Sequence, residues 1–342
     1  MGESTADTPR STDLETVLQT GVMDPDVFAR HLGGMALLGS NGEAVRAADV
    51  RVHGLLRHHA GKRCTLEIAV RTGDDWRLLI AKIYRKDRSD VFQALKGIQQ
   101  SGFGPQDEYS ISQPVGYVPS LRCVLQEKVD GTAAHEIILS GDEPARAAAA
   151  ERCALWLARF HALAPKIGPI TDSKEFVHSK RMHRWSRDVG RGQGSFGEKA
   201  ARLLDQVNGA SASVSDAELR AGQGSYTASH VLLSADRTAV IDWDRHDVAD
   251  PARDVARFLY ALRRWALEQL DSIRALDRVA DVFLNTYLAA GGPVEKNLPF
   301  FEAVTCLNLA VRHLFDGGPW EEDKAEAMLD EGLRILEGRA TV

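Results

Sequence analysis

Residues 222–258 constrain the fold of this chain more than any other stretch, because short apolar runs and carboxylates alternate in it. Residues 231–233 and 239–241 are typical of two short strands joined by a turn, and Asp242 follows the second strand directly. A helix is expected to begin at Pro251. Further carboxylates lie at Asp244, Asp247, Asp250 and Asp254. A hairpin with a carboxylate just beyond its buried strand suits Mg²⁺, which takes a few carboxylate oxygens together with substrate phosphates.

The size and charge of the chain limit the classes of protein to which it can belong. At 342 residues it is long enough for two lobes, each with its own core. A net charge of −6 argues against nucleic acid as the main partner, because nucleic-acid binding normally requires a basic face. No apolar run approaches the length of a membrane span, and no apolar signal region is expected at the N-terminus. The 4 cysteines lie far apart in apolar segments, so we expect reduced core thiols in a cytoplasmic protein without a membrane partner.

The first third of the chain predicts a small sheet. Residues 1–35 are expected to form a mobile tail, up to about Thr16, and a short helix capped by Asp24. Residues 50–55, 64–70 and 76–84 alternate between apolar and polar side chains, which predicts three antiparallel strands. Lys82 lies inside the third strand, where a lysine either extends to solvent or meets a fixed anion.

The pattern becomes mainly helical in the second part. A helix is expected at 89–100 and a buried strand at 121–126, followed by a turn at Gly131. Further helices are expected at 145–163, 279–288, 301–315 and 325–336. The sequence therefore predicts an α+β fold with two lobes. Residues 36–130 form a small antiparallel-sheet N-lobe, and residues 131–342 form a larger, mainly helical C-lobe that contains the hairpin.

The sequence VLL…VIDWD…DPARDVARFL resembles the aminoglycoside and choline kinase-like phosphotransferases, which are relatives of the protein kinases. In that family the corresponding segments read NVL, I-D-x-x and G-D-P-x-x-D-L-A. The resemblance extends from about residue 45 to the C-terminus. It implies a bilobal protein-kinase-like fold, binding of ATP and Mg²⁺, and transfer of the γ-phosphate to a hydroxyl of a small molecule or a peptide.

The resemblance also assigns roles in nucleotide binding. Lys82 matches the lysine that pairs with the α- and β-phosphates. The segment whose backbone hydrogen-bonds adenine corresponds to residues 126–129, with Gln126, Glu127 and Val129. A basic loop at 57–63 takes the place of the phosphate-covering loop. It contains one glycine, so the side chains of Lys62 and Arg63 are expected to supply what backbone N–H groups would otherwise provide.

In the C-lobe, Asp242 matches the Mg²⁺-binding aspartate, and Asp254 matches an aspartate that we interpret as structural. The family's catalytic loop normally reads H-G-D-x-x-x-x-N, and alignment back from Val231 places it at residues 223–230, QGSYTASH. The base aspartate is therefore replaced by Ser225, and the second metal-binding asparagine by His230. Serine is not a carboxylate base and histidine is a poor Mg²⁺ ligand, but imidazole can act as a base near neutral pH.

The lysine that binds phosphate usually pairs with a glutamate in the following helix. Residues 92–100 contain no glutamate, and Asp90 and Glu108 are the alternatives.

Two hypotheses of function follow. The first is an ATP- and Mg²⁺-dependent phosphotransferase with a hydroxyl acceptor, whose catalytic residues are Ser225, His230 and Asp242. The second is a catalytically degenerate pseudokinase that binds nucleotide, a peptide or a protein partner, as kinase-like proteins do beside peptide-modifying lyases in some bacterial biosynthetic pathways.

Other segments suggest weaker candidates. The residue types of a Ser-His-Asp triad are present at Ser225, His230 and Asp242. The G-x-S-x-G sequence that surrounds the serine of such hydrolases is absent, which argues against a hydrolase. Residues 178–185 are basic with one tryptophan, which fits either a solvated helix face or a groove for a substrate or partner. His161 is expected to be a hydrogen-bonded core histidine.

Overall fold

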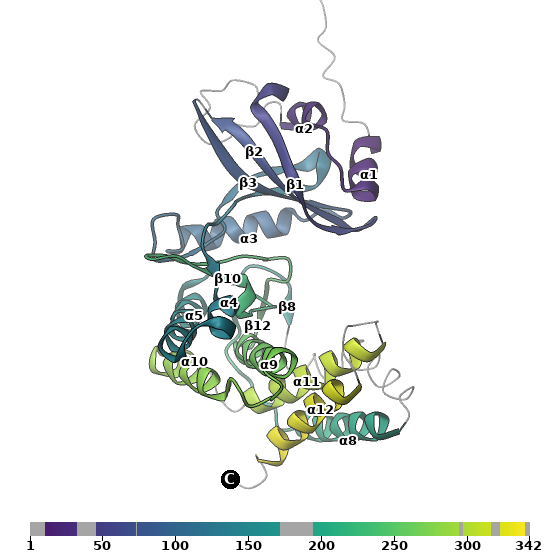
Figure 1. Ribbon diagram of the computed structural model, residues 1–342, viewed down its shortest axis with the longest axis vertical. Helices are drawn as coiled ribbons and strands as arrows, with labels where there is room; N and C mark the ends of the chain where they lie inside the picture. Colours follow the sequence, from purple (N-terminus) through teal and green to yellow (C-terminus); the bar gives the residue numbers. More distant parts are fainter. Residues whose placement is uncertain are drawn as a thin grey trace, which may run out of the picture. The chain divides into compact units, whose positions relative to one another are not determined.

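The computed structural model describes residues 11–32, 46–72, 74–171, 194–293, 297–315 and 322–338, and the chain divides into two compact units between Asp130 and Gly131 (Figure 1). We call them the N-lobe and the C-lobe. The first is built on an antiparallel sheet and the second is mainly helical, which confirms the α+β fold expected from the sequence. No helix among the described residues has the length and apolar character that a membrane span requires.

The N-lobe contains helices α1 (Ser11–Thr20), α2 (Pro25–Leu32) and α3 (Ser89–Gln100) and short 3-10 turns at Ala47–Asp49 and Pro119–Leu121. Its strands are β1 (Val50–His59), β2 (Arg63–Thr72), β3 (Asp75–Tyr84), β4 (Tyr109–Ile111), β5 (Pro114–Val118) and β6 (Cys123–Glu127). Five of these strands form an antiparallel sheet in the order β1-β2-β3-β6-β5. β3 is the central strand, so Lys82 is held between two paired neighbours.

The N-terminal helices correct the mobile tail that the sequence predicts up to Thr16. α1 begins at Ser11 and buries Leu14, Val17 and Leu18, whose spacing matches one helical face. Together with α2 it covers one face of the sheet, as Figure 1 shows. The polar composition around these residues hides the apolar face. The N-terminal segment therefore contributes to the core of the N-lobe.

The basic loop expected at residues 57–63 is shorter in the structure. β1 continues through His58 and His59, which pair with Cys64 and Arg63 of β2. Only residues 60–62 form the turn. The backbone N–H and C=O groups of β1 and β2 pair as an antiparallel ladder at these positions, so the strands continue to the turn.

The C-lobe contains helices α4 (Ala134–Ser140), α5 (Glu143–Leu163), α8 (Gly194–Ser211), α9 (Ala252–Gln269), α10 (Asp277–Ala289), α11 (Leu298–Phe315) and α12 (Glu322–Glu337). Its strands are β7 (Thr132–Ala133), β8 (Ile170–Thr171), β9 (Arg220–Gly222), β10 (Val231–Leu233), β11 (Thr238–Val240) and β12 (Asp247–Ala249), and a 3-10 turn spans Ala228–His230. The expected hairpin is β10-β11, and β7 pairs with β10. β12 lies between β8 and β9.

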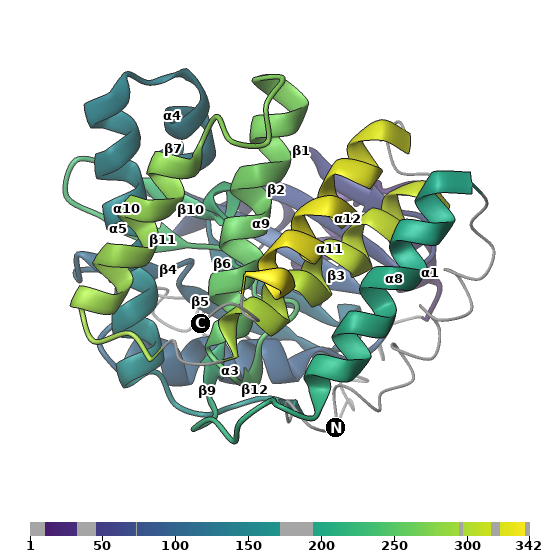
Figure 2. The ribbon, with the colours of Figure 1, turned by 90° about the horizontal axis from the view of Figure 1, so that it is seen from below.

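The helices of the C-lobe pack in two groups. α5 packs against α10, and α9, α11, α12 and α8 lie side by side (Figure 2). The expected helix at 145–163 is confirmed as α5, which begins where Asp142 accepts a hydrogen bond from the Ala145 N–H over 2.9 Å. Its buried residues Cys153, Trp156, Leu157 and Phe160 are those that the sequence places in the core.

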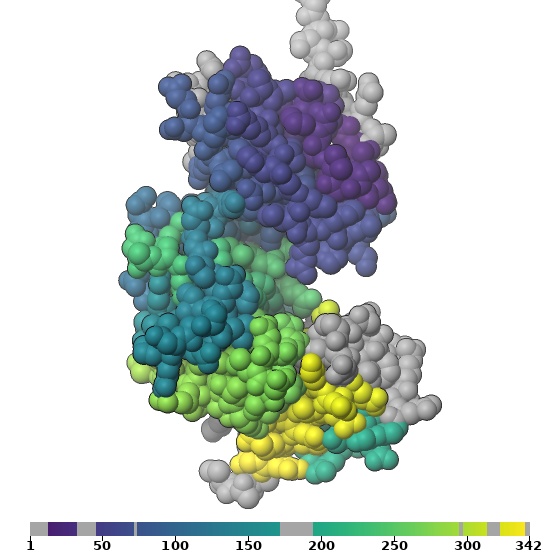
Figure 3. All heavy atoms as spheres, viewed as in Figure 1, coloured from purple at the N-terminus to yellow at the C-terminus, as the bar shows by residue number. Residues whose placement is uncertain are grey.

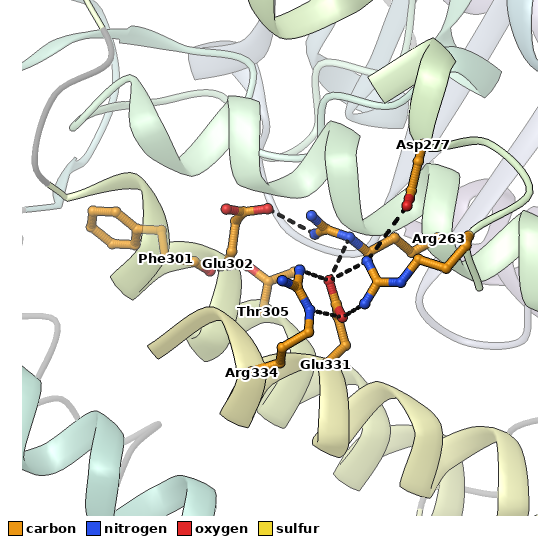
Figure 4. Close-up of polar contacts among 8 residues, drawn as sticks. Arg263, Asp277, Phe301, Glu302, Thr305, Glu331 and Arg334 are labelled. Carbon is orange, nitrogen blue, oxygen red and sulfur yellow. Dashed lines mark hydrogen bonds and ion pairs between the residues drawn. The ribbon is translucent and has the colours of Figure 1, made fainter. Parts of the chain in front are cut away.

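A buried ionic cluster joins α9, α11 and α12 (Figure 4). Arg263 pairs with Glu302 at 2.7 Å and with Glu331 at 3.1 Å. Glu331, whose side chain is 1% exposed, also accepts from Arg334 at 2.8 Å and from Arg274. The cluster ties three helices together through one carboxylate.

At the surface, the yellow α12 and the teal α8 lie against each other (Figure 3). Lys199 of α8 bridges Glu326 at 2.9 Å and Asp330 at 2.8 Å. These side-chain hydrogen bonds raise the pKa of Lys199 and lower that of Glu326. Both groups are charged at neutral pH, so the bridge adds modestly to the helix contact.

Candidate functional site

Asp242 lies two residues after the end of β11, at the end of the hairpin. Its backbone has φ of 62°, a left-handed conformation that costs energy for a residue with a side chain and is often found at functional sites. The side chain is 24% exposed, so its carboxylate can reach a ligand. The next residue, Trp243, is fully buried and donates from Nε1 to the Val240 carbonyl over 3.1 Å. Trp243 therefore anchors the chain where Asp242 turns.

Gln223 fixes both Asp242 and the loop at 223–230. Its buried carboxamide donates from Nε2 to the carbonyl oxygens of Asp242 at 2.8 Å and Ile241 at 3.2 Å. Its Oε1 accepts from the backbone N–H of Ser225 at 2.9 Å and from the Ser225 hydroxyl at 3.3 Å. The sequence patterns alone predict no role for Gln223. Its position as the first residue of the QGS segment is the signal that could have drawn attention to it.

Asp254 ties the same loop to α9. Its buried carboxylate accepts from the backbone N–H of Gln223 at 2.7 Å and of Gly224 at 2.9 Å. Behind it, His161 Nε2 lies 3.6 Å from Asp254 Oδ2, and His161 Nδ1 shares a 2.7 Å hydrogen bond with the hydroxyl of Tyr287. His161 is 1% exposed, so the expected core histidine is confirmed. The contacts of Asp254 agree with a structural role.

Gly224 allows the loop to pass close to the segment after Asp242. Its φ is 76°, and a Cβ at this position would lie 1.9 Å from the Arg245 carbonyl oxygen. The neighbouring Tyr226 is buried and donates to the Cys153 carbonyl of α5 over 2.7 Å. The loop is thus held by α5, α9 and the hairpin at once.

His230 completes the arrangement at the other end of the loop. Its Nδ1 lies 3.1 Å from the carbonyl oxygen of Ser225. A carbonyl oxygen only accepts, so Nδ1 carries the proton, and in a neutral imidazole Nε2 has the lone pair. Nε2 lies 3.6 Å from Asp242 Oδ2. The structure therefore brings together Ser225, His230 and Asp242, as the sequence analysis expects.

The donor set at Asp242 fits one kind of metal ion. Among the described residues, no group of three or more His, Cys, Asp or Glu side chains is arranged to hold a metal. Asp242 and His230 supply two partly exposed donors. A hard cation such as Mg²⁺ needs few protein ligands because water and substrate phosphates supply the remainder. The carboxylate of Asp242 fits such an ion, whereas the imidazole of His230 is a weaker ligand for it, and the two do not form a cage made by protein alone.

Asp247 and Asp250, which follow the hairpin, have structural contacts. Asp247 forms a 2.6 Å ion pair with Arg253, and burial raises the pKa of its carboxyl despite that partner. Asp250 accepts from the Ala252 N–H at 2.9 Å, at the start of α9, and from Asn297 Nδ2 at 2.8 Å. These contacts explain why carboxylates recur after Asp242 without forming a larger metal site.

Lys82 lies on the central strand of the N-lobe and is 7% exposed. It pairs with Thr65 of β2 and Val124 of β6. Its neighbours in β3, Ala81 and Ile83, belong to the core under α1 and α2, so Lys82 faces the opposite side of the sheet.

Two acids were considered as partners of Lys82. Asp90 forms an ion pair with Arg88 at 3.0 Å, and Glu108 is exposed. The expected pair of Lys82 with an acid therefore stays a prediction.

The segment expected to bind adenine lies at the end of β6. Gln126 is buried, and the backbone N–H of Glu127 donates to the Gln113 carbonyl over 2.9 Å. The Lys128 N–H donates to the Leu78 carbonyl over 3.3 Å. For Val129, no backbone hydrogen bond joins its N–H to another described residue. The N–H of Val129 is therefore the backbone donor of this segment that is best suited to bind a ligand.

The basic turn between β1 and β2 is tied to α1. The Gly61 N–H donates to the Leu18 carbonyl and the Lys62 N–H to the His59 carbonyl, each over 2.8 Å. Desolvation and the charges of Arg57, Arg63 and Lys62 lower the pKa of His59. Because these backbone N–H groups are occupied, phosphate contacts at this turn would come from the side chains of Lys62 and Arg63. The basic segment 178–185 lies outside the described residues.

Comparison with known proteins identifies the family of the chain. Residues 70–293 match the phosphotransferase enzyme family APH. The chain belongs to this family. A search of curated proteins finds no match.

Three solved structures illustrate the likeness of the fold. A choline/ethanolamine kinase family protein from Mesorhizobium loti is 13% identical, with a TM-score of 0.56 over 83% of this chain and 88% of that chain. A putative aminoglycoside phosphotransferase from Ralstonia eutropha is 12% identical, with a TM-score of 0.63 over 88% and 95%. A choline kinase from Cryptosporidium parvum is 10% identical, with a TM-score of 0.59 over 88% and 93%. At these identities the likeness supports the protein-kinase-like fold.

Proposed function

We propose that this APH-family protein is an ATP- and Mg²⁺-dependent phosphotransferase that transfers the γ-phosphoryl group to a hydroxyl of a small molecule or peptide. One observation carries the proposal: Asp242 Oδ2 lies 3.6 Å from His230 Nε2. The backbone of Asp242 is left-handed, and Gln223 supports it through a hydrogen bond to the Asp242 carbonyl. Such a constrained, partly exposed carboxylate fits a phosphate-associated cation. The similar structures are named as aminoglycoside and choline kinases, which supports a hydroxyl acceptor.

In this proposal the N-lobe residues bind the nucleotide. Lys82 contacts the α- and β-phosphates, and the buried position of its strand gives the ammonium group a fixed direction. Lys62 and Arg63 contact the phosphates from the turn between β1 and β2. Val129 supplies the N–H for adenine at the end of β6, with the backbone of Gln126 and Glu127 beside it.

The C-lobe residues handle the cation and the proton. Asp242 would hold Mg²⁺, with His230 as a weaker second ligand, and the bound ion would neutralise the negative charge of the phosphates. The Nε2 lone pair of His230 can accept the proton of the acceptor hydroxyl only while it does not ligate the metal, because one lone pair cannot serve both, so the two roles of His230 are alternatives. Ser225 donates its hydroxyl proton to Gln223 and therefore presents lone pairs toward the acceptor. Because phosphoryl transfer through a loose transition state needs little early proton removal, a carboxylate base is not required for turnover.

The test is a thermal-shift titration with ATP, with and without Mg²⁺, on the wild type and Asp242→Asn. The control is Asp236→Asn, an exposed aspartate in the turn of the same hairpin. We expect Mg²⁺-dependent stabilisation and ADP release in the wild type and in Asp236→Asn, and loss of both in Asp242→Asn. If ATP stabilises none of the three proteins, the proposal fails and the partner-binding pseudokinase hypothesis replaces it.

A further inference from the structure

Positive charge gathers around α9 in the C-lobe, close to the loop that contains Ser225. The contributing residues are Arg245, Arg257, Arg264 and Arg312. Arg257 and Arg264 are two turns apart and therefore lie on one face of α9. Arg312 belongs to the last turns of α11, which packs beside α9 (Figure 2). Arg245 lies in the segment after Asp242.

The charge of Arg257 is uncompensated within the part of the chain that the structure describes. No hydrogen bond or ion pair joins Arg257 or Arg245 to another described residue, and the guanidinium of Arg257 lies 5.8 Å from the ring centre of Tyr260. Arg264 Nε is buried without a hydrogen-bond partner and lies 3.8 Å from Glu268. Burial, and then the charges of Arg264, Arg245 and Arg312, lower the pKa of Arg257 to about 10.

Other arginines of α9 show that this arrangement is not a general property of the helix. Arg253 pairs with Asp247 at 2.6 Å, and Arg263 pairs with Glu302 at 2.7 Å. A partly buried guanidinium normally has such a partner, because desolvation of an unpaired cation is unfavourable. The face that contains Arg257 therefore has the charge of an anion-binding site whose anion is not supplied by the described residues.

The position of Arg245 connects this face with the candidate catalytic loop. A Cβ on Gly224 would lie 3.2 Å from the Cβ of Arg245, so the two segments are in contact. Gly224 immediately precedes Ser225. A molecule bound through these arginines would thus lie beside the loop that contains the proposed acid-base residues.

We propose that Arg257, together with Arg245, binds an anionic group of the acceptor, so that the acceptor is a hydroxyl compound carrying a carboxylate or a phosphate. The guanidinium forks match either anion geometrically. The same charge disfavours a cationic acceptor such as choline. The inference rests on the proposed function only in assigning the bound anion to the acceptor.

The test measures anion binding without turnover. The full-length protein, saturated with Mg²⁺ and ADP, is titrated with inorganic phosphate and separately with acetate, and its melting temperature is followed at constant ionic strength. The variants are Arg257→Gln, Arg257→Lys and the control Arg278→Gln, an exposed arginine of α10 paired with Glu143. We expect stabilisation of the wild type and control, with half-saturation at least about tenfold weaker in Arg257→Gln and intermediate in Arg257→Lys. The more effective anion identifies the acceptor group.

Equal anion responses in the wild type and Arg257→Gln overturn the inference, as does a wild-type response no larger than that to chloride. Each variant is compared with its own melting temperature without anion, so a general loss of stability does not hide the result. Asp242→Asn separates this inference from the proposed function. Suppose that Asp242→Asn still responds to the anion and that the wild type does not respond to ATP. The proposed nucleotide site is then wrong, and the proposed anion site is still supported.

Discussion

The carboxamide of Gln223 donates a hydrogen bond to the backbone carbonyl oxygen of Asp242 over 2.8 Å. The same carboxamide accepts from the Ser225 N–H at its other end. One neutral side chain thus sets both the left-handed backbone that directs the Asp242 carboxylate and the position of Ser225. In an H-G-D sequence a histidine would occupy this place, with a different number of donors and acceptors.

We expect Gln223→Ala to weaken both the site and the fold. Removing the carboxamide leaves the buried carbonyls of Ile241 and Asp242 unsatisfied, which costs about 1–3 kcal/mol of unfolding free energy. Asp242 loses its backbone support, so the Mg²⁺-dependent response to ATP should weaken as well. Urea unfolding and the ATP thermal shift measure the two effects. Gln93→Ala, at an exposed position of α3, is the control and should change neither. An unchanged ATP response in Gln223→Ala would show that Asp242 does not depend on this bond.

His230 should determine which divalent cation the site prefers. An imidazole nitrogen is a softer ligand than the amide oxygen of asparagine, so His230→Asn should favour Mg²⁺ over Co²⁺. We expect the ratio of half-saturating Mg²⁺ to Co²⁺ concentrations, measured with ATP present, to fall about tenfold, equivalent to roughly 1.4 kcal/mol. His135→Asn, also in the C-lobe but on α4, serves as the control. If the ratio does not change, His230 is not a metal ligand.

Replacing Ser225 tests the base position directly. Ser225→Asp supplies a carboxylate where the family has one, and general-base catalysis contributes about 10²–10⁴-fold in rate. We expect a smaller rise in kcat, about tenfold, because the Oε1 atom of Gln223 faces the new carboxylate. Ser225→Ala removes only the 3.3 Å hydrogen bond and should leave kcat within about threefold of the wild type. A fall in kcat for Ser225→Asp, with the response to ATP intact, would contradict the assignment of position 225 as the place of the catalytic base.

The local patterns of the sequence were sufficient to predict the fold and part of the site. Alternation predicts β2 and β3, and the carboxylate after an apolar strand marks Asp242. Neither requires knowledge of distant residues. The grouping of Ser225 and His230 with Asp242 also follows from local order, because the loop and the hairpin are consecutive in the chain.

The remaining features depend on contacts that sequence order does not contain. The role of Gln223 depends on the direction of its side chain toward Asp242. The charge around Arg257 depends on how α11 packs against α9, which brings Arg312 to it. α1 was missed because polar residues surround its short apolar face. Each of these is a result of tertiary packing.

The cluster at Glu331 provides a prediction about stability alone. Glu331→Gln leaves Arg263, Arg274 and Arg334 without the charge of their shared carboxylate (Figure 4). Removing one partner of a buried ion pair typically costs about 3–5 kcal/mol, and we expect a loss of unfolding free energy of this size at pH 7. Glu337→Gln, on the exposed end of α12, should cost less than about 1 kcal/mol. Urea unfolding of the two variants makes the comparison.

The pH dependence of this loss should have a definite sign. Burial raises the pKa of Glu331, but hydrogen bonds from Arg334 and Arg274 and the charge of Arg263 lower it more, so the folded pKa lies below the ordinary value. A carboxyl group with a lowered folded pKa contributes stability above its unfolded pKa of about 4.3 and loses that contribution as the pH falls through the folded value. The difference between wild type and Glu331→Gln should therefore shrink when unfolding is measured below about pH 4. A difference that stays constant from pH 7 to the acid limit would show that packing, and not charge, accounts for the effect of the variant.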